Sequence, residues 1–374
     1  MLIVAAILAI FVYGMIAAML GTVLPDFSKR FSLTPKQNGN IAMSQAIGLM
    51  IGSFFIGPLV DTQGVRVGLL LGLGLISLAL FGLRTAQSGA VIAGMMMLLG
   101  TGGGCIVTAA NTLPPHIKME ALTTAGVYNL LNLFFGLGGL VTPLIAASLF
   151  KNNSNKLLLF AGSLCLVTFV DHAATEMPPA AGKVGFQVSS VTELLSQGSL
   201  LAIALVLFVY VAAEVGVWNW LTRHLIAQGV DEKKALTILS LGFALGLLLG
   251  RVAISPMLGN IKPEQALIGA SVLMAITTFL IAQSTKPSVA WGLVFLAGVA
   301  MAPVFPTALA IVGTKFPDKA ATAIGIAVTA GWFGLVVSSP IIGGIAGDDP
   351  KRLKKALLVL PACSVIMLLA ALAL

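Results

Sequence analysis

The chain has 374 residues, of which 58% are hydrophobic and only 9% are charged, and its formal net charge is +8. A soluble domain carries roughly a quarter of its residues as Asp, Glu, Lys and Arg. The composition therefore excludes a water-soluble globular protein and requires a surface that faces lipid. The positive charge is spread over many short polar segments, which suits anionic lipid headgroups and gives no sign of a nucleic-acid partner.

Long apolar windows follow one another along the whole chain. About 20 apolar residues are enough for a helix to cross a bilayer, and the alternation expected of barrel strands is absent, which leaves helices as the spanning structure. We expect an all-α, multi-pass protein of a bacterial inner (plasma) membrane with twelve transmembrane helices. The windows lie at about 1–24, 37–60, 67–87, 90–114, 120–149, 156–172, 197–222, 235–258, 264–283, 288–313, 319–346 and 355–374.

The two halves of the chain resemble each other on either side of a weakly apolar stretch at 171–198. Three pairs of segments recur in the same order at nearly constant separation: FVY at 11–13 and 208–210, AIGLMIGS at 46–53 and ALGLLLGR at 244–251, and FGLGGLVTPLI at 135–145 and FGLVVSSPII at 333–342. We expect two six-helix bundles, 1–172 and 197–374, joined by a cytoplasmic linker at 173–196. Transporters built as parallel repeats bind their solute near the midplane between the halves.

The segment GPLVDTQGVRVG, at 57–68, falls between the second and third windows. It resembles the loop signature of the major facilitator superfamily, G-x-L-x-D-x-x-G-x-R, which is matched by Gly57, Leu59, Asp61, Gly64 and Arg66. The resemblance implies a conformational latch in which the carboxylate and the guanidinium bond neighbouring helix ends. The alternative is an ordinary polar turn.

Five further segments resemble the fucose–galactose–glucose/proton symporter family. They are GTGGGCIVTAANTL (100–113), NLLNLFFGLGGLVTPLI (129–145), YVAAEVGVWNWL (210–221), GLLLGRVAIS (246–255) and MAPVFPTALA (301–310). The resemblance implies a sugar transporter with cytoplasmic termini, although most Lys and Arg then fall on the opposite side, against the positive-inside rule. The carboxylates that this family uses for proton coupling align with Gly21 and Val107, neither of which can titrate.

Two charged side chains stand out inside the windows. Glu214 is the acid that lies well inside one, and such carboxylates usually face a cavity or a partner. We expect it to bind the solute or a coupling proton, and the alternative is a structural hydrogen bond between helices. Arg251 is expected to act at a gate or on the solute, or else to extend to the membrane surface. A direct pair between Glu214 and Arg251 is not expected.

Amides inside the windows are the expected solute ligands, because an amide both donates and accepts hydrogen bonds and so suits hydroxyl groups. We expect Gln45, Asn111 and Asn132 to bind the solute together with Glu214 and Trp332. For each amide the alternative is hydrogen bonding between helices. Phe305 and Pro306 are expected to break the tenth helix and form a hinge. The histidines His116, His172 and His224 lie at or near expected loops.

These features predict a secondary-active or facilitative transporter that moves a small neutral solute, a monosaccharide or polyol, by alternating access. We expect a monomer in contact with membrane lipid, with no cofactor, no metal and no enzymatic activity. The candidate coupling ions are H⁺ and Na⁺. A facilitator is slightly favoured over proton coupling through Glu214, because that carboxylate has no clear basic partner. The alternatives are a proton-coupled drug or metabolite efflux antiporter and a non-transporting membrane sensor.

Overall fold

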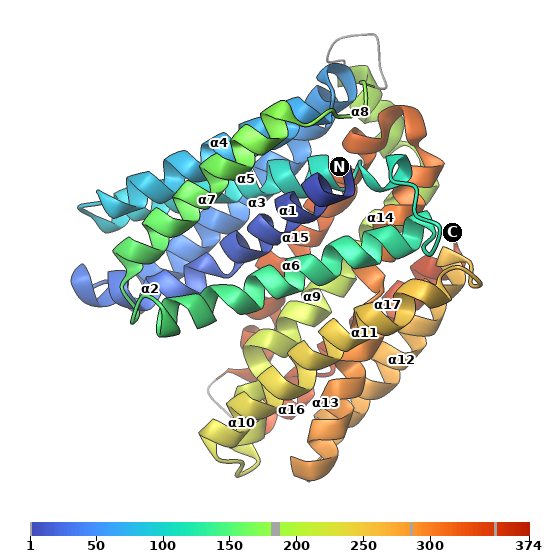
Figure 1. Cartoon of the computed structure of the whole chain (residues 1–374). Helices are drawn as coiled ribbons and strands as arrows, with labels where there is room; N and C mark the ends of the chain where they lie inside the picture. Colours follow the sequence, from blue (N-terminus) through green and yellow to red (C-terminus); the bar gives the residue numbers. More distant parts are fainter. Residues whose placement is uncertain (1, 181–187, 285–286, 348–349) are drawn as a thin grey trace. The chain divides into compact units, whose positions relative to one another are not determined.

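The computed structural model describes residues 2–180, 188–284, 287–347 and 350–374, and within these ranges the chain is helical and has no strand (Figure 1). The first part of the chain forms α1 (Leu2–Ala17), α2 (Met19–Arg30), α3 (Pro35–Gln63), α4 (Val65–Arg84), α5 (Gly89–Ala110), the 3-10 turn η1 (Pro114–His116), α6 (Thr124–Ser148), α7 (Ser154–Ala174) and α8 (Val188–Leu195). The second part forms α9 (Gly198–Ala227), α10 (Glu232–Ile238), the π-helical η2 (Leu239–Ala244), α11 (Leu245–Met257), α12 (Pro263–Gln283), α13 (Pro287–Met301), α14 (Val304–Lys315), the 3-10 turn η3 (Pro317–Lys319), α15 (Ala320–Ala346), α16 (Pro350–Ala356) and α17 (Val359–Leu372).

Twelve helical stretches within the described ranges are long and apolar enough to cross a membrane, which confirms the predicted fold class. The first stretch, Leu2–Arg30, combines α1 and α2 and extends past the predicted end at residue 24, because Pro25 lies inside α2 and does not end it. The eighth stretch, Glu232–Met257, contains the π-helical η2.

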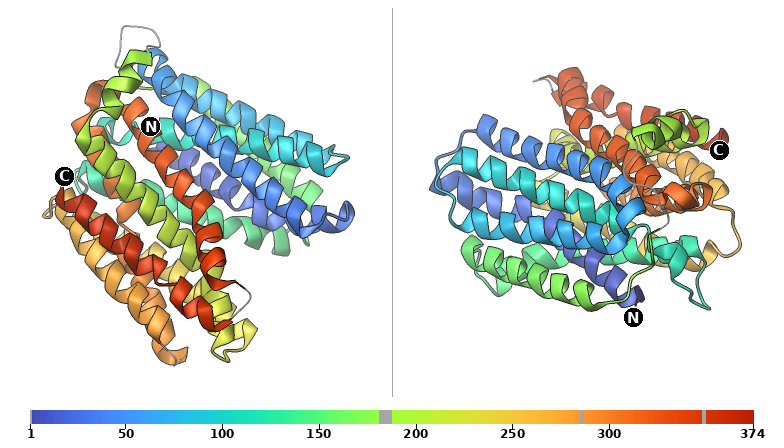
Figure 2. Two further views of the ribbon diagram at one scale, coloured as in Figure 1. Left: turned by 180° about the vertical axis from the view of Figure 1, so that it is seen from behind. Right: turned by 90° about the horizontal axis from the view of Figure 1, so that it is seen from above.

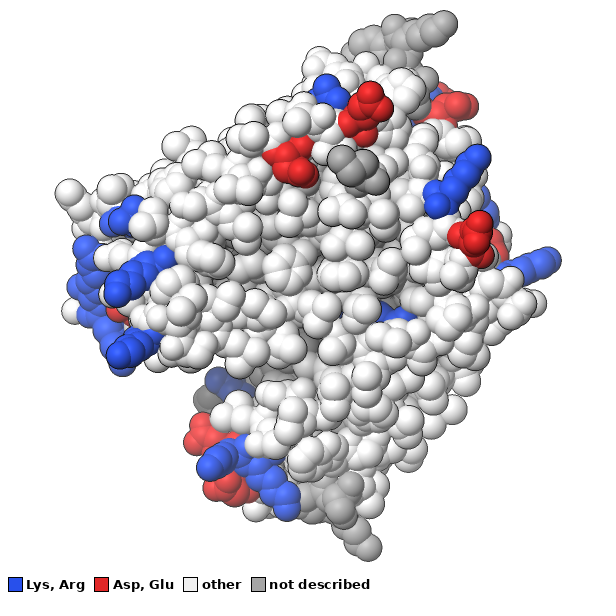
Figure 3. Space-filling view, viewed as in Figure 1, with Lys and Arg blue, Asp and Glu red and all other residues white. Residues whose placement is uncertain are grey.

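Helix α4 shows how the apolar residues divide between core and lipid. One face is fully buried, at the helical spacing of Leu69, Leu73, Ile76, Leu80 and Leu83. Leu71 and Leu78, on the other side, are exposed although they are just as apolar. On the face drawn in Figure 3, charged residues gather near helix ends and leave the helix flanks uncharged. Such flanks are what a lipid-facing surface requires.

Glycines bring α3 and α5 into direct backbone contact. A Cβ atom at Gly48 would overlap the carbonyl oxygen of Met97, and one at Gly100 would overlap the carbonyl oxygen of Gln45. Small residues are the usual means of close helix approach in membranes. Gly48 and Gly100 therefore serve helix packing.

By its contacts the chain divides into two compact units. Unit 1 comprises Met1–Lys118, Leu131–Thr192 and Gly313–Thr329, and unit 2 comprises Met119–Leu130, Glu193–Val312 and Ala330–Leu374. In unit 1, α5 packs on α1, α3 and α4, and α7 packs on α4 and α1 (Figure 2). In unit 2, α17 packs on α9 and α12, and α13 packs on α11 and α12. Residues 119–130 thus belong to unit 2 and residues 313–329 to unit 1. The division into two six-helix bundles at 172 and 197 stays a prediction.

Candidate functional site

A tight turn separates α3 from α4 in unit 1. Gly64 is the single residue between the two helices, and its φ of 93° lies in the region that favours glycine. Its N–H donates to the carbonyl oxygen of Val60 at 2.8 Å, which closes the end of α3. The turn places Asp61 in the last turn of α3 and Arg66 in the first turn of α4.

The Asp61 carboxylate binds the first turn of α15. One oxygen accepts from the Ala321 N–H at 2.9 Å, and the other accepts from the Thr322 N–H at 2.9 Å and from the Thr322 hydroxyl at 2.5 Å. The first N–H groups of a helix have no partner within the helix, and the helix dipole favours an anion there. Asp61 thus caps α15 from another helix, and Lys319 adds a favourable charge interaction.

Gly57, one turn before Asp61 on α3, allows the two helices to approach. A Cβ atom at Gly57 would lie 2.6 Å from both the Ala321 carbonyl oxygen and the Thr322 Cα. Further along, the Thr329 hydroxyl lies 3.5 Å from the Met50 carbonyl oxygen. We call the contact formed by Gly57, Asp61, Ala321 and Thr322 the α3–α15 latch. All four residues belong to unit 1.

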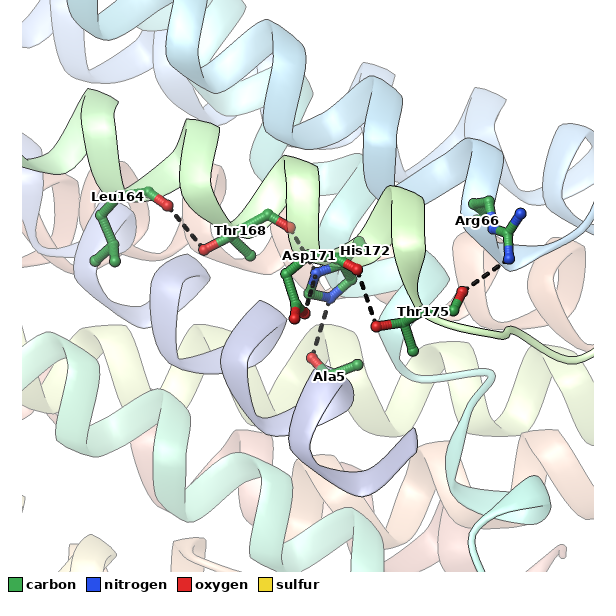
Figure 4. A network of polar contacts seen from close by, with 7 residues as sticks. All are labelled: Ala5, Arg66, Leu164, Thr168, Asp171, His172 and Thr175. Carbon is green, nitrogen blue, oxygen red and sulfur yellow. Dashed lines mark hydrogen bonds and ion pairs between the residues drawn. The ribbon is translucent and has the colours of Figure 1, made fainter. Parts of the chain in front are cut away.

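Arg66 bonds a different helix end. Its Nη2 donates to the carbonyl oxygen of Thr175, the residue that follows α7, at 2.8 Å (Figure 4). Among the bonds of the described residues, none joins Asp61 to Arg66. The two charges of the 57–68 segment therefore act on separate helices: the anion at the start of α15 and the cation at the end of α7.

Asp61 also borders a cavity of about 140 Å³ within unit 1. Gly64, Thr112, His116 and Ala320 contribute to its lining. The carboxylate therefore lies beside open space as well as against α15, which leaves room for the latch to open.

Unit 2 contains a polar cluster formed by Tyr210, Glu214 and Arg251. Tyr210 is fully buried on α9, Glu214 follows one turn later and is half-buried, and Arg251 on α11 is 6% exposed. The Tyr210 hydroxyl lies near the side chains of both Glu214 and Arg251, although it forms no hydrogen bond of good geometry. Arg251 is thus largely buried in the protein. Glu214 and Arg251 both lie beside Tyr210, and no contact between them contradicts the expectation that they form no direct pair.

The remaining predicted solute ligands form two sets. Gln45, Asn111 and Asn132 belong to unit 1 and are 7%, 1% and 6% exposed. The Asn111 amide donates to the Val107 carbonyl oxygen of its own helix at 2.7 Å. Trp332 is half-buried on α15 in unit 2. All three amides are therefore buried within largely apolar helices, as a solute site or a bond between helices requires.

The tenth span is interrupted. The break between α13 and α14 lies at Ala302 and Pro303, and Pro306 falls in the first turn of α14. A proline is tolerated in a first turn because its missing N–H would have no helical partner there. Because Pro306 has no N–H for the carbonyl oxygen of Ala302, four residues earlier, the observed interruption lies where this proline would weaken the helix. A hinge at Phe305 and Pro306 stays a prediction.

The sequence also missed residues whose partners are remote in the chain. Thr322 belongs to no recognisable motif, and in the sequence Tyr210 is an aromatic residue inside an apolar span like several others. His172 and His224 were expected at or near loops, but both are buried, at 0% and 2% exposure. The third histidine, His116, is exposed. A histidine two residues from the end of a long helix gives no sequence signal that separates these environments.

The model described as Major Facilitator Superfamily matches residues 6–373. The chain belongs to the major facilitator superfamily. It is therefore an integral, multi-pass membrane protein of a transporter family. Protein TsgA of Escherichia coli O1:K1 / APEC is 21% identical over 335 residues, which cover 89% of this chain and 84% of that protein.

Solved structures of this superfamily share the fold over nearly the whole chain. The E. coli fucose:proton symporter FucP superposes with a TM-score of 0.85 at 17% identity, covering 99% of this chain and 98% of that one. The proton:xylose symporter XylE gives 0.79 at 15% identity, covering 99% and 94%. The human organic anion transporter MFSD10 gives 0.78 at 17% identity, covering 99% and 98%. At these identities the similarity is one of fold.

Proposed function

We propose that this transporter carries a small neutral, hydroxyl-rich solute, a monosaccharide or polyol, across a bacterial inner membrane by alternating access. The observation that carries the proposal is the set of buried amides, Gln45, Asn111 and Asn132, within the apolar helices of unit 1. A sugar that leaves water needs fixed groups that both donate and accept hydrogen bonds. The fold similarity to a fucose:proton and a xylose:proton symporter supports this solute class.

The α3–α15 latch is the proposed control of the conformational change. A carboxylate that accepts three hydrogen bonds at a helix N-terminus stabilises the state in which the two helices touch. Transport requires another state to be populated as well. We therefore expect the latch to form and break in each cycle, with Gly57 and Gly64 providing the close contact and the turn.

Coupling to protons through Glu214 becomes the favoured mechanism. The sequence alone favours a facilitator because Glu214 has no clear basic partner there, and the position of Tyr210 near both Glu214 and Arg251 supports proton coupling instead. An ionised Glu214 balances the buried Arg251 charge, and a protonated Glu214 leaves Arg251 available to another acceptor, such as a solute oxygen. Exchange between these two states links proton binding to solute binding. In this scheme Trp332 packs against the solute.

An anionic metabolite is the second candidate solute. Buried Arg251 favours it, because a guanidinium recognises carboxylates and other oxyanions. The fold similarity to an organic anion transporter is consistent with it. In that case Arg251, rather than the amides, would dominate binding.

A thermal-shift screen of the purified protein separates these candidates. Monosaccharides, polyols, organic anions and cationic drugs are compared, because a ligand that binds the folded state raises the melting temperature. We expect stabilisation by a sugar or polyol that is lost in Asn132→Ala and kept in Asn40→Ala, an exposed amide on α3. Stabilisation only by anions, lost in Arg251→Gln, would replace the neutral solute with the second candidate. Stabilisation only by cationic drugs would contradict both.

A further inference from the structure

His172 is a fully buried histidine that the proposed transport mechanism does not use. It lies two residues before the end of α7 and is 0% exposed. Its neighbour Asp171 has a side chain that is 49% exposed, so a buried imidazole and an accessible carboxylate stand side by side in the sequence. Both belong to unit 1.

Both ring nitrogens of His172 face main-chain carbonyl oxygens (Figure 4). Nδ1 lies 2.8 Å from the Thr168 oxygen on its own helix, and Nε2 lies 3.1 Å from the Ala5 oxygen on α1. A carbonyl oxygen only accepts hydrogen bonds, and a neutral imidazole has one N–H to donate. One of these contacts would then set a nitrogen lone pair against an oxygen lone pair inside the protein. Only the imidazolium, with two N–H groups, satisfies both.

A charged side chain lies beside the ring. The Asp171 carboxylate lies 3.5 Å from Nδ1. Helix α1 has no acidic or basic residue, and its Tyr13 is eight residues from Ala5, about 12 Å along the helix. On α4, Arg66 bonds the Thr175 oxygen and Arg84 lies at the far end of the helix. The charged residues of α2 are Asp26, Lys29 and Arg30. They follow the C-terminal end of α1 in sequence, whereas Ala5, which contacts the ring, lies near the N-terminal end of that helix.

We propose that His172 is a proton-binding site of this transporter, separate from Glu214. In the conformation described here the ring carries two protons and joins α7 to α1. Deprotonation breaks the N–H bond at Nδ1, and the proton passes to the Asp171 carboxylate or to water beyond it. The Nδ1 lone pair then faces the Thr168 oxygen, the ring turns away, and the bond from Nε2 to Ala5 is lost.

The proposed site lies against α1, the helix with which the first span begins. α1 and α2 together form that span, and the same span contains Gly21, where the resembling symporters carry a carboxylate. Proton binding at His172 therefore changes the packing of α1 on α7 without any acid at residue 21. The proposal does not depend on the identity of the solute.

Nitrogen NMR of the histidine side chains tests the proposal on the unmodified chain. The protein has three histidines, so ¹⁵N-histidine labelling gives few signals, and the His116→Gln and His224→Gln variants identify the signals of His172 by difference. The pH is varied from about 5 to about 9, which brackets the ordinary titration of histidine. We expect His172 to carry two protons at the acidic end and one at the basic end.

A single proton on His172 throughout this range would overturn the proposal. Two protons throughout would also overturn it, because the ring would then be a permanent structural cation. The signals of exposed His116 are recorded in the same spectra for comparison. This measurement needs no solute, so its failure is distinguishable from a failure of the proposed transport function.

A matched pair of variants tests the link to helix packing. Cysteines placed on α1 and α7 report their approach by cross-linking yield at several pH values. Because thiol reactivity itself rises with pH, the yield in the His116→Gln background is divided by the yield in His172→Gln at each pH. We expect this ratio to fall severalfold from acidic to basic pH. A ratio that stays constant with pH would show that His172 does not control the approach of α1 and α7 and would contradict the proposal.

Discussion

Thr322 gives both its main-chain N–H and its hydroxyl to one carboxylate oxygen of Asp61, at 2.9 and 2.5 Å, across 261 residues of sequence. The bond joins the last turn of α3 to the first turn of α15. Because charge-assisted hydrogen bonds contribute about 1.5–3 kcal/mol each, this contact is strong enough to bias a conformational equilibrium.

Neutralising the carboxylate tests the latch. In Asp61→Asn we expect the population of the latched state to fall roughly tenfold to a hundredfold, the equivalent of about 1.4–3 kcal/mol. The Ala321 and Thr322 amides should then exchange hydrogen faster, and transport should decrease while solute binding persists. Asp26→Asn, at an exposed position on α2, is the control. If amide hydrogen exchange and transport are both unchanged in Asp61→Asn, the 57–68 segment is an ordinary polar turn and not a latch.

A steric change should give the same result without altering charge. In Gly57→Ala the new Cβ atom would lie 2.6 Å from the α15 backbone, so α3 and α15 must separate. We expect faster amide exchange in the first turn of α15, as in Asp61→Asn. Gly39→Ala, on the same helix with nothing within 4 Å of its Cβ, should behave like the wild type. Equal behaviour of the two alanine variants would contradict the role of close approach.

The polar cluster of unit 2 should behave as one energetic unit. Tyr210→Phe and Glu214→Gln remove groups that interact with each other, so their effects on the free energy of unfolding should not add, with a coupling of about 0.5–3 kcal/mol. Thermal unfolding of the single and double variants measures the coupling. Tyr13→Phe, a buried tyrosine of unit 1, should add to Glu214→Gln. Additivity in both pairs would mean that Tyr210 does not link Glu214 to its surroundings.

The two positions without acids should differ in their tolerance of a carboxylate. Gly21 is exposed and has nothing within 4 Å of its Cβ, whereas Val107 is 3% exposed. We expect Gly21→Asp to change the melting temperature little, and Val107→Asp to cost several kcal/mol, because burying an unpaired charge is expensive. Equal stability of the two variants would show that residue 107 has access to water or to a partner.

Local patterns predicted the spans, since length and hydropathy are properties of short windows, and the 57–68 segment was found because its five motif residues lie close together in sequence. The partners of those residues could not be predicted. No sequence motif around Thr322 predicts its hydrogen bonds to Asp61, because they form only through tertiary packing. Pro306 indicated an interruption of the tenth span, because it has no N–H for the carbonyl oxygen four residues earlier, but the exact ends of α13 and α14 came only from the structure. The burial of His172 could not be predicted, because residues near helix ends are usually accessible, whereas here the ring packs against Ala5 of α1.

The central claim is coupled transport, and uphill solute accumulation in proteoliposomes tests it most directly. The solute identified by thermal shift is measured inside vesicles under an imposed pH gradient, with wild type and Glu214→Gln compared at equal protein content. We predict that the wild type accumulates solute above the outside concentration and that Glu214→Gln only equilibrates it. Equilibration by the wild type itself would make the protein a facilitator, and accumulation unaffected by Glu214→Gln would assign the coupling to another group or to Na⁺. Either result would contradict proton coupling through Glu214.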